Sequence, residues 1–309
     1  MTTKSRFQRL SSRPEIKELR FTLNMLRKSP LSIIGITIIL FFLFIALFAE
    51  VLAPPEPGKN PFFVPRAGYS PLPKPPNQEH PFGTTGFQFD IYYGCIWGTR
   101  TAFYVGISTV AFSLIVGTIV GSIAGYYGGK SDEITMRITD VFYAIPYLIL
   151  AMSFIVAFGT GIDSVILALV IVYWPGYARV MRGEFKRIRE EDFVEAAKAI
   201  GCSDFRIITR HILPNTIFPA LIMAALDSGT IVLVAATLSF LGLGVPHGYA
   251  DWGQMIAFSR DFITGLPGDP FAYWYTFMIP GIFIFTFVLG WSLLGDALRD
   301  ILDPMIRRK

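Results

Sequence analysis

Long apolar blocks separated by polar stretches dominate this chain. The first block covers residues 31–53, and it carries no charge before Glu50. As a helix it would rise about 34 Å, which is enough to cross a hydrocarbon layer about 30 Å thick. Thirty residues precede it, so we predict a retained membrane helix and not a cleaved signal peptide. Similar blocks predict five more spans, at residues 101–125, 141–158, 165–181, 216–240 and 275–294.

The spans differ in their small residues and prolines. The second span, 101–125, is rich in glycine, serine and alanine, which lets neighbouring helices approach closely. Pro146 and Pro175 fall inside the third and fourth spans, where neighbouring helices can satisfy the carbonyls that a proline leaves free. These features predict a tightly packed helical bundle.

The composition agrees with a membrane protein. The chain of 309 residues is 52% hydrophobic and only 16% charged, whereas a soluble domain carries roughly a quarter charged residues. Two cysteines exclude a disulfide-rich secreted scaffold. A net charge of +4 is too small to indicate binding to nucleic acid. We therefore predict an all-α polytopic membrane protein with six transmembrane helices.

Three polar segments connect the spans. Residues 54–98 contain ten prolines and predict an extended loop, and residues 241–274 predict a second loop rich in glycine, proline and aspartate. Residues 183–215 mix arginine, lysine, glutamate and aspartate densely, so this insert must lie in water.

Lysine and arginine indicate which side each segment occupies. Of the 27 basic residues, 21 fall in residues 1–30, 126–140, 182–215 and 298–309. The positive-inside rule therefore places both termini and the charged insert in the cytoplasm of a cell-membrane protein. The predicted parts are a cytoplasmic segment at 1–30, the first span at 31–53, an extracytoplasmic loop at 54–100, a five-helix core at 101–297 that contains the insert, and a cytoplasmic tail at 298–309.

The charged insert has the pattern of a helical hairpin. An acidic start and apolar residues at positions i, i+3, i+4 and i+7 predict a first short helix, with the apolar face Phe193, Ala196, Ala197 and Ile200. Gly201 ends this helix and Ser203 begins a second one, whose apolar residues are Phe205, Ile208 and Ile212. Such a hairpin either docks into a groove of a partner, which we favour, or lies on the membrane surface or on its own bundle.

Candidate chemistry within the chain is sparse. The three histidines and two cysteines lie on separate segments, so we predict no metal site and no catalytic site. Residues 124–131 resemble a phosphate-binding loop but follow a membrane span and not a buried strand, so we predict that they bind no nucleotide. If the protein works with ATP, another chain must hydrolyse it. Asp227 lies in the middle of the fifth span, where it either lines a pathway or bonds to a neighbouring helix. The candidate pathway residues are Asp227, Ser228 and Thr230.

Several motifs resemble those of a known family. The run Glu195-Ala196-Ala197, followed by Gly201 and then by Leu213-Pro214, resembles the EAA loop of permease subunits of bacterial and archaeal ABC importers. Further segments are similar to the dipeptide and oligopeptide permease family, and the resemblance covers residues 25–305. These segments are residues 80–84, 124–129, 238–245, 252–253, 280–281, 294–296 and 298–304.

The chain departs from the family pattern in places. Gln88-Phe89-Asp90 stands where the family usually has Gly-Arg-Asp, Thr85 replaces an acidic residue, and Ala235 replaces a glutamate. His211 stands where the general EAA pattern has isoleucine and this branch commonly has histidine. The resemblance implies transport of di- or oligopeptides, and the departures keep oligosaccharides or nickel open as alternative solutes.

The resemblance also implies partners and a mechanism. A type I ABC importer permease pairs with a second, related permease, two ATPase subunits that bind ATP and Mg, and an extracytoplasmic solute-binding protein. The residues implied in ATPase coupling are Phe193, Glu195, Ala196, Ala197, Ile200, Gly201, Asp204, Phe205, His211, Leu213 and Pro214. A structural membrane protein and a stand-alone channel or ion-coupled carrier are the competing hypotheses, but neither needs a docking hairpin.

Overall fold

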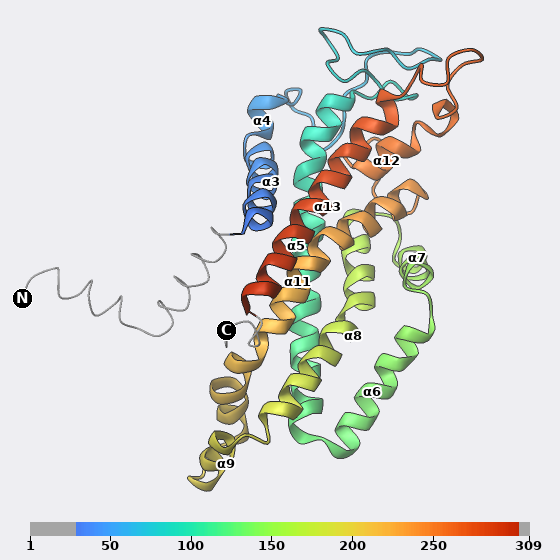
Figure 1. Cartoon of the computed structure of the whole chain (residues 1–309). Helices are drawn as coiled ribbons and strands as arrows, with labels where there is room; N and C mark the ends of the chain where they lie inside the picture. Colours follow the sequence, from blue (N-terminus) through green and yellow to red (C-terminus); the bar gives the residue numbers. More distant parts are fainter. Residues whose placement is uncertain (1–28, 303–309) are drawn as a thin grey trace, which may run out of the picture.

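The computed structural model describes residues 29–302, which form a bundle of long helices (Figure 1). Within this range there is no β-strand, only isolated bridges such as the one between Arg66 and Phe89. Residues 1–28 and 303–309, which hold most of the predicted N-terminal segment and of the tail, lie outside the described range. The helices are α3 (Pro30–Leu47), α4 (Ala49–Leu52), α5 (Ile91–Tyr127), α6 (Gly129–Ala144), α7 (Tyr147–Phe158), α8 (Ile162–Ile188), α9 (Asp192–Ala199), α10 (Asp204–Arg206), a π-helix (Ile207–Ile212), α11 (Leu213–Phe240), α12 (Trp252–Ala257), a 3₁₀-helix (Arg260–Phe262) and α13 (Tyr275–Leu302).

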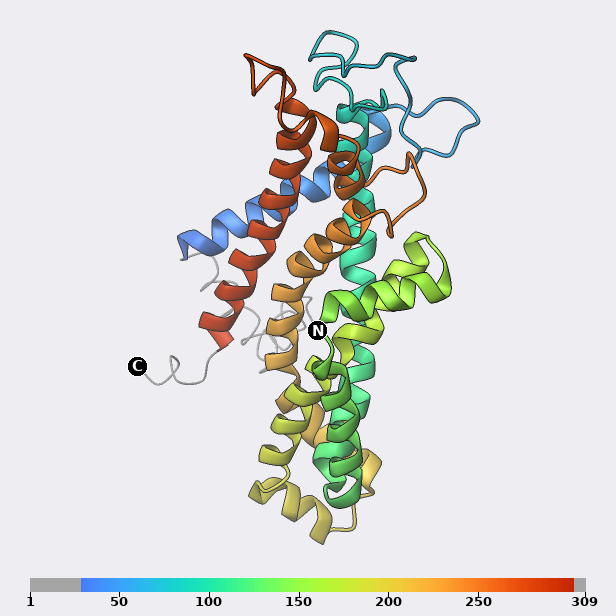
Figure 2. The ribbon, with the colours of Figure 1, turned by 90° about the vertical axis from the view of Figure 1, so that its right-hand side faces the viewer.

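Five helical segments are long and apolar enough to cross a membrane. They are α3, α5, α8, α13 and the continuous run from α10 to α11, and the bent pair of α6 and α7 supplies a sixth if it counts as one span. The prediction of an all-α membrane protein with six spans is confirmed on this count. Figure 2 shows α3 crossing α13 obliquely at the edge of the bundle.

The third predicted span is not continuous. α6 and α7 meet at a bend of 92° beside Pro146, so the span predicted over residues 141–158 consists of parts of two helices. The ring of a proline disfavours helical geometry in the residue before it, and Ile145 is extended here. The two helices form an elbow along one side of the bundle, and α7 packs against α8 (Figure 1).

Other helix ends also differ from the prediction. α5 begins at Ile91, so the end of the predicted loop 54–100 is helical, because the Asp90 side chain caps the helix by accepting a hydrogen bond from the Tyr93 amide. α8 continues to Ile188 and absorbs the start of the predicted insert. Charged residues at a helix end can remain helical beyond the apolar block, which a hydropathy pattern does not detect.

Residues 53–90 and 241–274 form a folded cover over one end of the bundle, which we call the loop cap (Figure 1). Buried side-chain donors tie it to the helices. The Trp97 indole donates to the Ala53 carbonyl at 2.9 Å, and the Tyr275 hydroxyl donates to the Pro73 carbonyl at 3.2 Å. A hydrogen bond in a water-poor region is costly to break, so the cap is fixed to the bundle.

α5 and α8 pack through a glycine seam, formed by Gly117, Gly121 and Gly125 at successive turns of α5. A Cβ atom on any of them would overlap α8, at Tyr177 and Ala178 for the first two and at Arg182 for the last. The absent side chains let the two backbones approach directly, as in other membrane bundles. The seam holds the ends of α5 and α8 side by side.

The seam makes Gly121 a critical position for stability. Gly121→Ala should destabilise the protein by about 1 to 3 kcal/mol, because the new methyl group has no space against the α8 backbone. Gly183→Ala is the matched control, since Gly183 lies on α8 with open space around it and alanine favours helix. Thermal unfolding of the purified protein in detergent measures both, and equal melting temperatures would contradict a packed seam.

Candidate functional site

A short helical hairpin forms the end of the molecule opposite the loop cap, at α9 in Figure 1. α9 is its first arm. The second arm is α10 with the π-helix that follows, and it runs directly into α11. Gly201 joins the arms with φ of +80°, a conformation that glycine adopts without strain. The predicted hairpin and its glycine turn are therefore present.

One side of the hairpin packs on the chain's own bundle. Val194 and Ala197 of α9 are buried, as are Ile207 and Ile212 of the second arm, and all four belong to the same apolar cluster as Phe185 of α8. Ala197 thus turns inward, which differs from the prediction that all four apolar residues of the first arm face a partner. Part of the pattern reflects packing inside the chain.

The other side of the hairpin is exposed. Phe193 is 43%, Ile200 is 81% and Phe205 is 77% exposed, and Glu195 and Ala196 are exposed beside them. We call these five residues the hairpin face. Large apolar side chains that remain exposed in one patch are typical of an interaction surface.

The second arm does not keep the predicted spacing of its apolar residues. Phe205 is exposed and Ile212 is buried, although their spacing would place them on one face of an α-helix. The π-helix at Ile207–Ile212 has wider turns and so shifts the phase of the residues after it. His211 and Leu213, both half-buried, and exposed Pro214 lie where this arm joins α11.

Polar contacts attach the hairpin to the end of α5, and the end of α5 to the end of α8. The Tyr126 hydroxyl donates to Oδ1 of Asp204 at 2.6 Å, and the Tyr126 carbonyl accepts from Nη1 of Arg189 at 3.0 Å. Arg189 also bonds to the carboxylate of Glu190, which lowers the pKa of this glutamate. The motif pattern contained Tyr126 but did not indicate this role.

A second ion pair connects the elbow of α6 and α7 to α8. The Arg182 guanidinium of α8 binds both carboxylate oxygens of Asp132 on α6, at 2.5 and 2.6 Å. A bidentate pair of this kind fixes orientation as well as distance. The contact ties α6 to α8 near the hairpin.

The predicted pathway residues of α11 do not share one accessible surface. The buried Ser228 hydroxyl donates to the Ala224 carbonyl at 2.8 Å, and the exposed Thr230 hydroxyl donates to the Leu226 carbonyl at 3.3 Å. Asp227 is half-buried, and its Oδ2 has no hydrogen-bond partner among the described residues. Two of the three side chains are thus bonded to their own helix.

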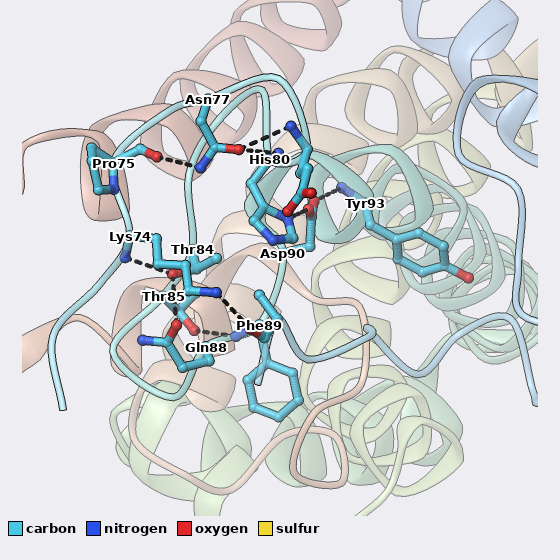
Figure 3. A network of polar contacts seen from close by, with 12 residues as sticks. Lys74, Pro75, Asn77, His80, Thr84, Thr85, Gln88, Phe89, Asp90 and Tyr93 are labelled. Atoms are coloured by element: carbon cyan, nitrogen blue, oxygen red, sulfur yellow. Dashed lines mark hydrogen bonds and ion pairs between the residues drawn. The ribbon is translucent and has the colours of Figure 1, made fainter. Parts of the chain in front are cut away.

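Figure 3 shows the polar network that holds the loop cap at the start of α5. Nδ1 of His80 lies 2.6 Å from Oδ2 of Asp90, whose other oxygen caps α5. Gln88 has φ of +64°, and its side chain donates to the carbonyls of Leu72 at 2.7 Å and Ser70 at 3.3 Å. Gln88 stands where the resembling family usually has glycine, and these two bonds offset the cost of a left-handed conformation.

A hollow of about 400 Å³ opens on the loop cap. Arg66, Phe89 and His247 line it, and the Arg66 guanidinium lies 4.6 Å from the centroid of the Phe89 ring. Burial and the charge of Arg66 lower the pKa of His247, so this histidine is neutral at neutral pH. Over residues 29–302, no three histidine, cysteine, aspartate or glutamate side chains gather as metal ligands.

Comparisons with known proteins agree with these observations. The profile of the family described as "Binding-protein-dependent transport system inner membrane component" matches residues 117–308, and that of the "N-terminal TM domain of oligopeptide transport permease C" matches residues 20–71. A dipeptide transport system permease protein, DppC, of Alkalihalophilus pseudofirmus is 38% identical over 93% of this chain and 90% of its own length. The DppC protein of Bacillus subtilis is 34% identical over 96% of this chain and 88% of its own length.

Solved structures show the same fold. A chain of the MetNI methionine ABC transporter, in an inward-facing conformation, aligns with a TM-score of 0.52 and 19% identity over 68% of this chain and 97% of that one. A second crystal form of MetNI aligns with a TM-score of 0.51. These alignments confirm the predicted type I ABC importer fold.

The six-span bundle with its exposed hairpin is therefore the membrane subunit of an ABC importer, which resides in the inner membrane. The chain belongs to the family of binding-protein-dependent transport system inner membrane components, in its dipeptide and oligopeptide permease branch.

The loop cap contains a carboxyl group that should make stability depend on pH. Asp251 caps α12 by accepting from the Gln254 amide at 2.8 Å, but burial raises its pKa to about 6. In the unfolded chain the value is about 3.9, so the folded state binds the proton more tightly. The protonated Asp251 carboxyl therefore contributes to the free energy of unfolding at low pH, and this contribution is lost as the pH rises through about 6.

Comparison with Asp251→Asn tests this dependence, because asparagine also caps a helix and does not ionise. The wild-type protein should lose stability relative to the variant as the pH rises from about 4 to 7, with most of the loss between the two pKa values. Melting temperatures across this range measure the difference. A difference that stays constant with pH would contradict it.

Proposed function

We propose that this permease forms one half of the translocation pathway of an importer for di- and oligopeptides. A second, related permease forms the other half, two ATPase subunits bind and hydrolyse ATP with Mg, and an extracytoplasmic binding protein delivers the solute. The names of the relatives, dipeptide and oligopeptide permeases, support the solute class. The departures at Thr85, Gln88 and Ala235 keep oligosaccharides or nickel as the alternative.

The exposed hairpin face carries the proposal of ATPase coupling. Phe193, Ile200 and Phe205 extend from the end of the bundle with large exposed areas, which is the form of a ridge that fits a groove. Ala196 leaves space for close approach, and Glu195 can accept hydrogen bonds at the same surface. We assign this face to the contact with an ATPase subunit.

The hairpin can move the spans because of how it is connected. Its second arm continues through the π-helix into α11, and its first arm follows α8 by a short link. A displacement of the hairpin by a closing pair of ATPases would therefore turn α8 and α11, which opens the pathway to the other side of the membrane. The residues that would transmit this movement within the second arm are Asp204, His211, Leu213 and Pro214. The candidate pathway residues of α11 are still Asp227, Ser228 and Thr230.

A pair of neighbouring alanines tests the docking role. Ala196→Trp should abolish uptake and reduce ATPase association while the protein accumulates normally, because this side chain is exposed. Ala197→Trp should instead lower abundance, since Ala197 is 5% exposed and packs on the core. Gly201→Trp should also uncouple transport, because the +80° turn does not suit tryptophan.

The measurements are expression level, pull-down of the ATPase subunits, and uptake of radiolabelled peptide by the reconstituted importer. Normal uptake with tryptophan at both Ala196 and Gly201 would overturn the assignment. Uptake of an oligosaccharide or nickel in place of peptide would instead change only the solute class.

The orientation follows from the basic residues and can be tested by labelling. We propose that the hairpin lies in the cytoplasm and the loop cap outside, since 21 of the 27 basic residues belong to the segments assigned to the cytoplasm. In a protein without Cys95 and Cys202, Tyr69→Cys should react with an impermeant maleimide on intact cells, because Tyr69 is 97% exposed on the cap. Glu190→Cys should react only after lysis, and the reverse pattern would invert the topology.

A further inference from the structure

The cytoplasmic end of α5 is not directly connected to the hairpin in the chain, yet one residue there contacts both of its arms and the link that precedes it. Tyr126 is the last residue but one of α5 and is 6% exposed. Its carbonyl accepts from Arg189 where α8 ends, its ring faces Nζ of Lys198 in α9 at 5.8 Å, and its hydroxyl donates to Asp204 at the start of α10. These contacts thus involve the residue that precedes the hairpin, its first arm and its second arm.

The contacts differ in strength, and the bond to Asp204 is the strongest candidate for a mechanical link. A hydrogen bond from a hydroxyl to a carboxylate at 2.6 Å is short and charge-assisted. The Tyr126 ring belongs to the apolar cluster that contains Val194 and Ile207, which holds the donor in place, while Asp204 lies on the exposed side of the hairpin. Lys198, at 5.8 Å, adds a weaker attraction.

The bond to Asp204 lies across the turn of the hairpin. Both arms pack in the same apolar cluster, at Val194 in the first arm and Ile207 in the second, so the hairpin is one packed unit. Because Asp204 begins the second arm, its bond to Tyr126 attaches this unit to α5 on the far side of the turn at Gly201. A displacement of the hairpin therefore acts on α5 through this bond.

The glycine seam extends the effect along the bundle. Gly125 precedes Tyr126, and its close contact with Arg182 keeps this end of α5 against α8. A force that reaches Tyr126 is therefore shared by both helices, because neither can slide without breaking the close backbone packing.

We propose that Tyr126 is a positioning residue for coupling, which transmits displacement of the hairpin to α5 through its hydrogen bond to Asp204. This inference rests on the proposed contact between the hairpin face and an ATPase subunit. It adds that α5, and not only the covalently attached α8 and α11, is driven by the hairpin.

Tyr126→Phe tests the proposal, because it removes only the hydroxyl and keeps the ring. In the complete importer, reconstituted with both permeases, both ATPases and the binding protein, ATPase association should be unchanged. Peptide uptake per ATP hydrolysed should fall by about threefold to tenfold, which corresponds to the loss of one hydrogen bond of this kind. A merely structural role would reduce abundance or association and leave this ratio unchanged.

Three further variants complete the experiment. Tyr127→Phe is the matched control and should change nothing, since Tyr127 is exposed and its hydroxyl makes no hydrogen bond within residues 29–302. Asp204→Ala breaks the same bond from the exposed hairpin, so it covers the case in which Tyr126→Phe folds poorly. The double variant should be no worse than either single one, because both remove one interaction.

The outcomes separate this inference from the proposed function. A wild-type ratio of uptake to ATP hydrolysis in both Tyr126→Phe and Asp204→Ala would overturn the role of Tyr126, even if Ala196→Trp still prevents ATPase association. Strictly additive losses in the double variant would also overturn it. If Ala196→Trp leaves association and uptake normal, the docking assignment itself fails.

Discussion

The close approach of the α5 and α8 backbones is the constraint on which the rest of the structure depends. Because Gly117, Gly121 and Gly125 present no side chain to α8, the two helices run together along this seam and end together. At their shared end, Arg189 bonds the end of α8 to the Tyr126 carbonyl, and the Tyr126 hydroxyl holds the hairpin through Asp204. At the other end, the same α5 begins under the loop cap. The packed helices α5 and α8 thus connect the end of the molecule that carries the hairpin with the end that carries the loop cap.

The fold class and the position of the hairpin could be predicted from the sequence because both depend on composition and short-range spacing. Apolar blocks of sufficient length specify membrane helices, and an acidic start with a glycine stop specifies the first arm at Asp192–Ala199. The bend beside Pro146 was harder to predict from the sequence, because a proline within a span can kink a helix slightly or, as here, stand at a bend of 92°. Neighbouring helices decide between these outcomes.

The division of the hairpin into an inner and an outer side could not be derived from the sequence. A pattern of apolar residues at helical spacing shows that a face exists, but not whether the chain itself covers it. Ala197 packs inward while Ala196 stays exposed, and the π-helix then changes the phase so that Phe205 and Ile212 separate. The role of Tyr126 also depends on tertiary contacts with residues 189 and 204, which no local pattern connects.

The Gln88 side chain shows how the loop cap is held in shape without regular secondary structure. Its two bonds to main-chain carbonyls, with the His80–Asp90 pair beside them, order a segment that has many prolines and no strand within the described residues. The conformational entropy of this segment is therefore already lost when the protein folds. A protein that binds the cap would meet a preformed surface, and its association would not have to offset the ordering of a loop. Such a preformed surface is compatible with rapid, repeated binding of a partner protein to the loop cap.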